Sequence, residues 1–549
     1  MEFDAVLLAP RRARMIEEGL WHDRTINNDL DACLAACADK LALTAYRVEA
    51  GDVRRFTYRE LAQMADRVAL GLSRLGVKPN DVVACQLPNW WQFTVTYLAC
   101  SRIGAVINPL MHIFRERELN FMLKHGEAKV IIAPKVFRGF DYEQMITAIQ
   151  PNLPDLKHIV VVDGQGANSF EALLSGPAWE SEPDAATILG AHRPGPDDIT
   201  QLIYTSGTTG EPKGVMHSAN TVMANIIPYA QRLQLDAEDV VLMASPMAHQ
   251  TGFMYGLMMP IMLKASAVLQ DIWEPKKAVE VINGEKASFT MASTPFLTDL
   301  TKAVVDNMTP VPTLKTFLCA GAPIPGPLVE QARAALGTKI VSAWGMSENG
   351  AVTLIELNDP DERAFTTDGK PLAGVDLKVV DIDGNTAPAG EAGKLYVRSC
   401  SNFGGYLKRP QWNNTDAEGW FDTGDLARMD AQGYIRITGR SKDVIIRGGE
   451  NIPVVEIESL LYRHPAIAMV AVVAYPDERL GERACAMVVP KPDQVFDLAT
   501  MAAYLKEQKV AQQYIPERVE VLPAMPTTPS GKIQKFKLRE QLLALLQKT

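Results

Sequence analysis

The sequence predicts an α/β protein with a large multi-subdomain N-terminal domain of parallel-rich sheets and a small mobile C-terminal α/β domain. Two observations predict this fold. Helical stretches alternate with short β-branched runs over residues 57–133, a pattern typical of crossover units and parallel sheets. From about residue 433 onward a second set of strands and helices follows. We place the boundary near residues 439–442, which divides the chain into domains 1–439 and 440–549.

The first clear helix is expected over residues 57–75. Thr57 and Glu60 form a T-x-x-E capping box at its start, and Gly76 is placed to end it. The apolar residues between them repeat at helical spacing. Next in the chain we expect a strand at 82–87, a helix at 93–103, a strand at 105–108, a helix at 116–124 and a strand at 129–133.

The C-terminal part contains enough elements for a separate small α/β domain. Residues 433–438 alternate between apolar and polar side chains, as in a strand. Further strands are expected at 468–474 and 484–489, and helices at 454–463, 498–509 and 536–546.

Composition excludes several classes of protein. The 549-residue chain is 47% hydrophobic and 22% charged, unlike a disordered tail, a collagen or a coiled-coil rod. Its net charge of −10 lacks the footprint of a general nucleic-acid binder. Seven thinly spread cysteines do not form a disulfide framework, so a reducing cytoplasm fits best. Cys33 and Cys37 are spaced for packing within a helix, and no other metal-ligand cluster accompanies them.

One stretch calls for a membrane check. Residues 240–263 contain no Asp, Glu, Lys or Arg. They also contain Pro246, His249, Gly252 and Pro260, which favour a buried strand, loop and helix around a cavity. We therefore expect no integral membrane segment, and the N-terminus does not have the form of a targeting sequence.

The most informative stretch is residues 204–215. Its glycines allow backbone N–H groups to converge, its hydroxyls add donors, and a lysine adds a cation, a combination that can cradle a polyphosphate. These residues are Thr205, Ser206, Gly207, Thr208, Thr209, Gly210, Lys213 and Gly214. The spacing is not that of a Walker A loop, and Ser/Thr/Gly runs are also common in plain surface loops.

This stretch resembles the phosphate-binding signature of the acyl-adenylate-forming (ANL) superfamily, which includes acyl-CoA synthetases, peptide-synthetase adenylation domains and luciferases. Four further signatures of that family follow in order. They are 343–349 (AWGMSEN), 419–426 (GWFDTGDL), 437–443 (ITGRSKD) and 529–533 (PSGKI). Residues 442–452 and 477–482 are most similar to carboxylate–CoA ligases, notably bacterial short- and medium-chain or alicyclic acid CoA ligases such as cyclohexanecarboxylate–CoA ligase.

The resemblance implies a ligase of fatty acid metabolism with ATP, Mg²⁺ and coenzyme A as cofactors. A carboxylate is a poor electrophile, so it first attacks the α-phosphate of ATP to give an acyl-adenylate and pyrophosphate. The CoA thiol then displaces AMP. Because the first step brings an anion to a polyanion, a cation is needed where they meet. The family match assigns this cation to Lys532 and the Mg²⁺ ligands to Glu348 and Thr205.

The resemblance also assigns the nucleotide contacts. Ser347 would donate to the α-phosphate, Trp344 would offer its face to adenine, and Asp425 would accept both ribose hydroxyls. Family members more often have Tyr and Thr at positions 344 and 347, and both changes keep the stacking face and the hydroxyl. The remaining contacts are Gly321, Ala322 and Pro323 of the adenine loop, Gly345 and Met346 beside Trp344, and Ile437 and Arg440 before the hinge.

Two half-reactions in one site require two arrangements of the molecule. The resemblance identifies Lys442 as the pivot about which the C-terminal domain alternates. Lys532 faces the adenylate in one arrangement, and Gly448 and Gly449 line the thiol channel in the other.

The acid is expected to be a medium-sized apolar monocarboxylate: a medium-chain fatty acid, an alicyclic acid such as cyclohexanecarboxylate, or a small aromatic acid. By position in the family, the acyl-site residues are His249, which also has a catalytic gating role, Phe253, Ala320 and Ala343. This stretch lacks the Asp that amino-acid-activating relatives keep for the α-amine.

Other interpretations remain open on the sequence alone. The enzyme could transfer the acyl group to a carrier protein or another acceptor, or the chain could be a non-catalytic ligand sensor on the same fold. A membrane acyl transporter is disfavoured by the broken apolar run at 240–263. A homodimer and a lysine acetyltransferase acting on Lys532 are open as partners.

Overall fold

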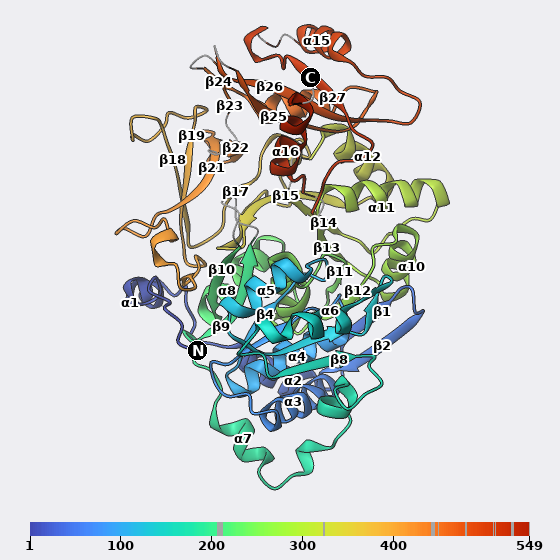
Figure 1. Ribbon diagram of the computed structural model, residues 1–549, viewed down its shortest axis with the longest axis vertical. Helices are drawn as coiled ribbons and strands as arrows, with labels where there is room; N and C mark the ends of the chain where they lie inside the picture. Colours follow the sequence, from blue (N-terminus) through green and yellow to red (C-terminus); the bar gives the residue numbers. More distant parts are fainter. Residues whose placement is uncertain are drawn as a thin grey trace.

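The computed structural model describes residues 1–205, 212–321, 324–440, 445–447, 450–477, 480–508, 510, 512–528 and 532–547. It is a mixed α/β structure with two large sheets, a four-stranded sheet and a small C-terminal sheet (Figure 1). The predicted fold class is therefore confirmed. The N-terminal elements, drawn in blue, lie at one end of the molecule and the C-terminal elements, drawn in red, at the other.

The first large sheet has the order β20-β10-β9-β4-β3-β5-β8. Its central strands are parallel, and β10 and β20 pair antiparallel at one edge. The bounds are β3 Val82–Cys85, β4 Val106–Pro109, β5 Ala128–Pro134, β8 His158–Val162, β9 Ile199–Thr205, β10 Lys213–Ser218 and β20 Gly405–Tyr406. Helices α3 (Tyr58–Arg74), α4 (Trp91–Ile103), α5 (Glu116–His125) and α6 (Tyr142–Ile149) connect or flank these strands.

The predicted alternation over residues 57–133 is confirmed with ends that shift by one or two residues. Thr57 caps α3 by accepting a hydrogen bond from the Glu60 backbone N–H, and the Glu60 side chain returns to the Thr57 backbone. Gly76 follows the end of the helix with a φ of +81°.

The second large sheet has the order β17-β16-β15-β14-β13-β11-β12-β1-β2. Strands β1, β12, β11, β13, β14 and β15 run parallel. The bounds are β1 Leu41–Arg47, β2 Asp52–Thr57, β11 Val240–Met243, β12 Ser266–Gln270, β13 Phe289–Ala292, β14 Thr316–Ala320, β15 Lys339–Met346, β16 Gly350–Leu354 and β17 Lys370–Pro371. Helices α8 (Ala219–Arg232), α10 (Pro275–Glu285), α11 (Thr294–Asn307) and α12 (Gly326–Leu336) belong to this half.

Residues 240–263 form the buried strand, loop and helix that the sequence predicts. Strand β11 is followed by a π-helical segment, η4 (Thr251–Met258), and by α9 (Met259–Leu263). Among the described residues, no helix combines the length and the apolar character that crossing a membrane requires.

The antiparallel sheet β18 (Val375–Val380), β19 (Ala392–Ser399), β21 (Phe421–Met429) and β22 (Ile435–Arg440) comes before the C-terminal part. The strand predicted at 433–438 therefore begins two residues later and pairs with β21. The C-terminal elements are β23 Ile445–Arg447, β24 Glu450–Ile452, α14 Val454–Leu461, β25 Ile467–Asp477, β26 Gly481–Pro490, α15 Leu498–Glu507, β27 Arg518–Val521 and α16 Lys535–Leu546.

Smaller elements complete the structure. They are α1 Ala9–Glu17, α2 Ile26–Cys37, β6 Val136–Phe137, β7 Phe140–Asp141, η1 Gln150–Asn152, η2 Glu171–Ser175, η3 Trp179–Ser181, α7 Ala185–Ala191, α13 Arg363–Thr366, η5 Pro410–Trp412 and η6 Gln512–Tyr514. One hydrophobic core extends from Leu8 to Ile435, and two separate clusters begin at Ile445 and at Ala471. The boundary at 439/440 falls between these cores and stays a prediction.

Candidate active site

The candidate site lies where parallel strands of the second large sheet end. The carboxyl ends of β13, β14 and β15 meet at one edge, the usual place for a ligand in such a sheet. Ala320 and Ala343 lie side by side there, on neighbouring strands. Gly345 allows the chain to turn back closely, because a Cβ on it would lie 1.9 Å from the Gly350 carbonyl oxygen. This turn carries Glu348.

Glu348 is buried and held at both its backbone and its side chain. Its carbonyl oxygen accepts a hydrogen bond from Phe403 N at 2.7 Å, and its Oε1 accepts one from the Tyr406 hydroxyl at 2.7 Å. Burial and the neighbouring carboxylate raise the pKa of Tyr406 far above its usual range, so its hydroxyl remains a donor. The Glu348 carboxylate is therefore fixed by a neutral donor.

The backbone beside Glu348 is also fixed. The Ser347 carbonyl oxygen accepts from His217 Nε2 at 2.7 Å and from Gln250 Nε2 at 3.4 Å. Burial lowers the pKa of His217 to about 4, which keeps the ring neutral at physiological pH. Met346 N donates to Asn349 Oδ1 at 3.1 Å, which closes the turn.

The candidate phosphate loop is closed at its base by two paired strands. Thr205 ends β9, Lys213 begins β10, and the two residues are cross-strand partners. The Lys213 Nζ lies 4.6 Å from the centre of the Tyr406 ring. The predicted phosphate-binding residues between them, Ser206, Gly207, Thr208, Thr209 and Gly210, lie outside the described residues.

The candidate ribose site is built around Asp425 on β21. Its Oδ2 accepts from Trp344 Nε1 at 2.9 Å, and its Oδ1 lies 3.0 Å from Arg440 Nε on β22. Nearby, Ile437 N donates to Asp368 Oδ2 at 2.8 Å. The pKa of Asp368 is raised, mainly by burial and also by the charge of Asp425, while Arg436 acts against this rise.

At the end of β14, Gly321 has a φ of +91°, a conformation that favours glycine. A Cβ added at Gly321 would meet no other atom within 4 Å, so there is open space beside this residue. Ala322 and Pro323, the other two residues predicted there, lie outside the described residues, as do Lys442, Gly448 and Gly449 of the predicted hinge and thiol channel.

The C-terminal Lys532 reaches the region of His249. The pKa of His249 is lowered to about 4, first by burial and second by the positive charge of Lys532. The Lys532 side chain is itself exposed, and its backbone N–H donates to Thr528 Oγ1 at 3.0 Å. Two predicted catalytic residues from distant parts of the chain are therefore close enough to interact.

Phe253 is the predicted site residue that the structure places deepest in the core. It is 1% exposed, and its ring packs edge-on against Tyr97 and Phe93 of α4, with centroid distances of 4.7 and 6.4 Å. Its role in acid binding stays a prediction.

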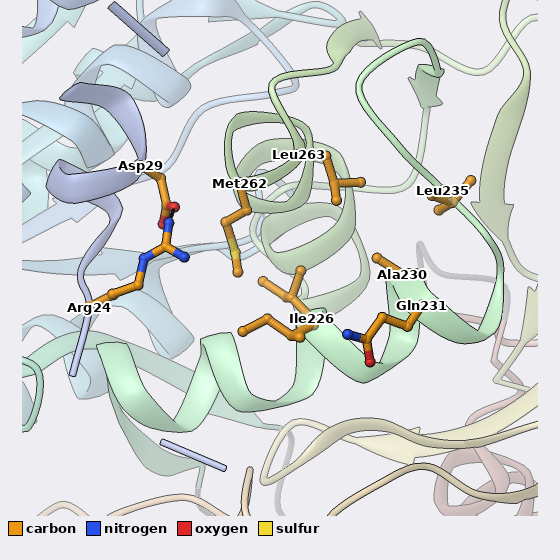
Figure 2. Close-up of a pocket in the computed structure, with 9 residues that line it drawn as sticks. Arg24, Asp29, Ile226, Ala230, Gln231, Leu235, Met262 and Leu263 are labelled. Atoms are coloured by element: carbon orange, nitrogen blue, oxygen red, sulfur yellow. Dashed lines mark hydrogen bonds and ion pairs between the residues drawn. The ribbon is translucent and has the colours of Figure 1, made fainter. Parts of the chain in front are cut away.

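A separate cavity of about 170 Å³ lies between α2, α8 and α9 (Figure 2). Its walls include Ile226 and Met262, and the ion pair of Arg24 with Asp29 lies at one end. None of the predicted site residues lines it.

Three residues that contact the site, Tyr406, His217 and Gln250, are not predicted by the sequence. Tyr406 follows two glycines far along the chain from Glu348, and His217 and Gln250 lie on or near apolar runs. None of them has a spacing that would have linked it to Glu348 or Ser347. Only the paired strands β10 and β20 bring Tyr406 to the site.

Comparison with known proteins identifies both parts of the chain. Residues 30–407 match the family described as AMP-binding enzyme, and residues 456–532 match the AMP-binding enzyme C-terminal domain. The chain is 37% identical over 539 residues to a medium-chain fatty-acid–CoA ligase of Escherichia coli (strain K12), covering 98% of this chain and 94% of that protein. It is 32% identical over 533 residues to a salicylyl-CoA synthase / salicylate adenylyltransferase of Streptomyces sp., covering 96% and 95%.

Two solved structures have the same architecture. The anthranilate CoA ligase AuaEII in complex with anthranoyl-AMP matches with a TM-score of 0.84 and 26% identity, over 95% of this chain and 98% of that one. ATP-bound MatB from Rhodopseudomonas palustris matches with a TM-score of 0.81 and 27% identity, over 94% and 99%.

Proposed function

Because the chain belongs to the AMP-binding enzyme family and is an AMP-forming acyl-CoA synthetase that uses ATP, Mg²⁺ and CoA, we propose that its acid is a medium-sized apolar monocarboxylate. In the first half-reaction the carboxylate oxygen attacks the α-phosphorus of ATP, and pyrophosphate leaves. In the second, the CoA sulfur attacks the acyl carbon, AMP leaves and the thiol proton is released.

The assignment of roles is supported by the charge of Lys532 acting on His249, together with the hydrogen bond from Gln250, next to His249, to the Ser347 carbonyl oxygen beside Glu348. The Lys532 ammonium would offset the repulsion between the acid and the α-phosphate. The neutral His249 would line the entrance to the acyl site without adding a second charge. Asp425 and Trp344 would hold ribose and adenine, with Gly321 letting the base approach the backbone.

The donor set fits Mg²⁺. Glu348 offers one carboxylate oxygen that has no hydrogen-bond partner among the described residues, and Thr205 offers a hydroxyl at the base of the phosphate loop. Mg²⁺ usually takes one or two protein ligands and completes its shell with phosphate oxygens and water. Among the described residues, no group of three or more His, Cys, Asp or Glu is placed so that it could hold a metal ion. When bound, the ion would neutralise charge on the phosphates.

The apolar character of the acid is supported by the walls near the strand ends. The residues of η4 from Gly252 to Met258 are buried, and the stretch 240–263 has no acidic side chain to bind an amine. Ala292 and Ala320 end β13 and β14, and Ala343 of β15 pairs with Ala320; these small side chains would leave room for an acyl group. The named substrates of the relatives, a medium-chain fatty acid and two aromatic acids, fall in the same class.

The test is an acid-dependent pyrophosphate-release screen with purified protein, ATP, Mg²⁺ and free CoA. The panel contains linear C4 to C12 acids, cyclohexanecarboxylate, benzoate, and an amino acid as a polar control. We expect turnover with one class of apolar acid in this panel and no turnover with the amino acid. Preference for the amino acid would overturn the proposed acid class.

A carrier protein is a second candidate acceptor, because one relative's name gives a salicylate adenylyltransferase beside a CoA synthase. AMP and acyl-CoA formation with free CoA would decide for CoA as the acceptor. The pivot at Lys442, the thiol channel at Gly448 and Gly449, a homodimer, and acetylation of Lys532 by an acetyltransferase stay predictions.

A further inference from the structure

We propose that Tyr406 is a positioning residue that fixes the Glu348 carboxylate and the Lys213 ammonium in one arrangement before ATP and Mg²⁺ arrive. This inference rests on the proposed roles of Glu348 and Lys213 in the site. In this inference Tyr406 contacts neither the acid nor the nucleotide, and acts through Glu348 and Lys213.

The hydroxyl of Tyr406 sets the orientation of Glu348. It donates to Oε1 at 2.7 Å and is the sole hydrogen-bond partner of that carboxylate among the described residues. Both residues are almost fully buried, at 3% and 6% exposure, so no bulk water replaces this donor. Because this hydrogen bond occupies Oε1, Oε2 is the oxygen left to face a metal ion. Side chains that hydrogen-bond to a metal ligand commonly orient the ligand in this way.

The ring of Tyr406 acts on the second group. Lys213 Nζ lies 4.6 Å from the ring centre, within the range of a cation–π contact. The ring itself is packed against Phe403 at a centroid distance of 4.7 Å, and Phe403 packs on Phe421 at 5.3 Å. The lysine is therefore steered by a side chain that has little freedom to move.

The backbone explains why one residue reaches both groups. Tyr406 pairs with Val215 between β20 and β10, and Leu407 N donates to the Gly214 carbonyl oxygen at 2.8 Å. Three residues earlier, Phe403 N donates to the Glu348 carbonyl oxygen. The segment 403–407 thus links the strand that carries Lys213 to the turn that carries Glu348.

The experiment compares Tyr406→Phe, which removes the hydroxyl and keeps the ring, with Tyr406→Leu, which removes both. In Tyr406→Phe, the Mg²⁺ concentration for half-maximal pyrophosphate release should rise about tenfold or more, while KM for the acid stays unchanged. Calorimetry of ATP binding with and without Mg²⁺ gives a readout that needs no turnover. The gain in ATP affinity on adding Mg²⁺ should shrink in Tyr406→Phe, and Tyr406→Leu should also weaken binding of ATP alone.

Tyr434 provides a matched control. Its hydroxyl donates to Asp359 at 2.8 Å, and Arg363 lies 4.2 Å from its ring centre, so it repeats the same two contacts away from Glu348. Tyr434→Phe should leave the Mg²⁺ dependence unchanged. If Tyr434→Phe and Tyr406→Phe shifted the Mg²⁺ dependence equally, the loss of any buried phenol hydroxyl would explain the shift. The positioning role of Tyr406 would then be wrong.

Glu348→Gln separates this inference from the function it rests on. If Glu348→Gln leaves the Mg²⁺ dependence unchanged, the proposed metal role of Glu348 fails. If it shifts that dependence and Tyr406→Phe does not, only the positioning role fails. Should Tyr406→Phe not fold, Glu348→Asp gives the same test, because the shorter carboxylate keeps its charge and moves away from the phenol. A normal Mg²⁺ dependence in Glu348→Asp would then overturn the inference.

Discussion

The two regions that supply the candidate catalytic groups are built differently. In the N-terminal part, Glu348 and Asp425 are 6% and 5% exposed and are held by hydrogen bonds from Tyr406 and Trp344. In the C-terminal part, Lys532 is exposed, and its backbone N–H donates to Thr528 Oγ1. Folding has therefore already fixed the groups proposed to hold the nucleotide inside the core, whereas the cation proposed to activate the acid lies at an exposed position of the C-terminal part.

Lys532→Ala tests this contrast with the largest expected effect. Removal of one group that stabilises developing charge typically costs about 10²–10³-fold in rate, so acid-dependent pyrophosphate release should fall by that factor. CoA attack on supplied acyl-adenylate should continue at a near-normal rate. Stopped assays of each half-reaction measure the two steps separately.

Lys535→Ala is the matched control for that variant. Lys535 lies three positions further on and pairs with Glu458 at 2.7 Å, within the C-terminal part. Its replacement should leave both half-reactions intact. Equal losses in the two half-reactions of Lys532→Ala would contradict an adenylation-specific role for Lys532.

Lys442→Pro tests whether the C-terminal region moves. Proline fixes φ, so a hinge at this position should stiffen, and thioester formation should fall about tenfold or more relative to adenylation. Lys442→Ala keeps the backbone free and should leave the ratio of the two rates unchanged. Rapid-quench measurement of acyl-CoA against pyrophosphate gives that ratio, and an unchanged ratio in Lys442→Pro would argue against domain rotation.

The same contrast explains what the sequence could predict. Helices with caps and apolar stripes, such as residues 57–75, are local features, and the structure confirms them with small shifts at the ends. Glu348, Asp425 and Lys532 could be named because each lies in a family signature. The distances between these residues could not be predicted from their positions in the chain. The nearness of Lys532 to His249, for example, depends on how the C-terminal part packs.

The supporting residues could not be predicted, because they act through contacts between distant segments. Tyr406 reaches Glu348 only through the pairing of β20 with β10, and His217 reaches the Ser347 carbonyl from the strand beside the phosphate loop. Neither residue has a periodicity or spacing that marks it. Composition also does not show that Phe253 packs against Tyr97 in the core.

Trp344→Phe tests the hydrogen bonds that hold the buried carboxylates of the N-terminal part, and its expected effect is smaller. The change keeps an aromatic face but removes the donor to Asp425 Oδ2, which leaves a buried acceptor unpaired and costs about 1–3 kcal/mol of stability. KM for ATP should rise as Asp425 loses its fixed orientation. Thermal unfolding and steady-state kinetics measure the two effects.

Trp90→Phe is its control, because Trp90 Nε1 makes the same kind of bond to Asp271 Oδ2 at 2.9 Å outside the site. This variant should lose comparable stability with no change in KM for ATP. If both variants changed KM for ATP equally, the Trp344–Asp425 bond would have no specific part in nucleotide binding.

The smallest expected effect concerns the interaction between the two regions, in which the charge of Lys532 acts on His249. The pKa of His249 is about 4, below the ordinary value of 6.5, because burial and the charge of Lys532 both disfavour its protonation. The unfolded chain takes up this proton near pH 6.5 and the folded chain only near pH 4, so the free energy of unfolding falls as pH decreases through that window. Lys532→Met should raise the pKa of His249 by less than burial lowers it, and should make this loss of stability shallower.

NMR titration of the imidazole signals checks this shift, with His249→Asn used to assign the resonance. His217 is the internal reference, because its pKa of about 4 arises mainly from burial and includes no contribution from Lys532. It should titrate identically in both proteins. An unchanged His249 titration in Lys532→Met would mean that the lysine does not reach His249 in solution. The exposed cation would then lie away from the fixed half of the site until substrates draw it in.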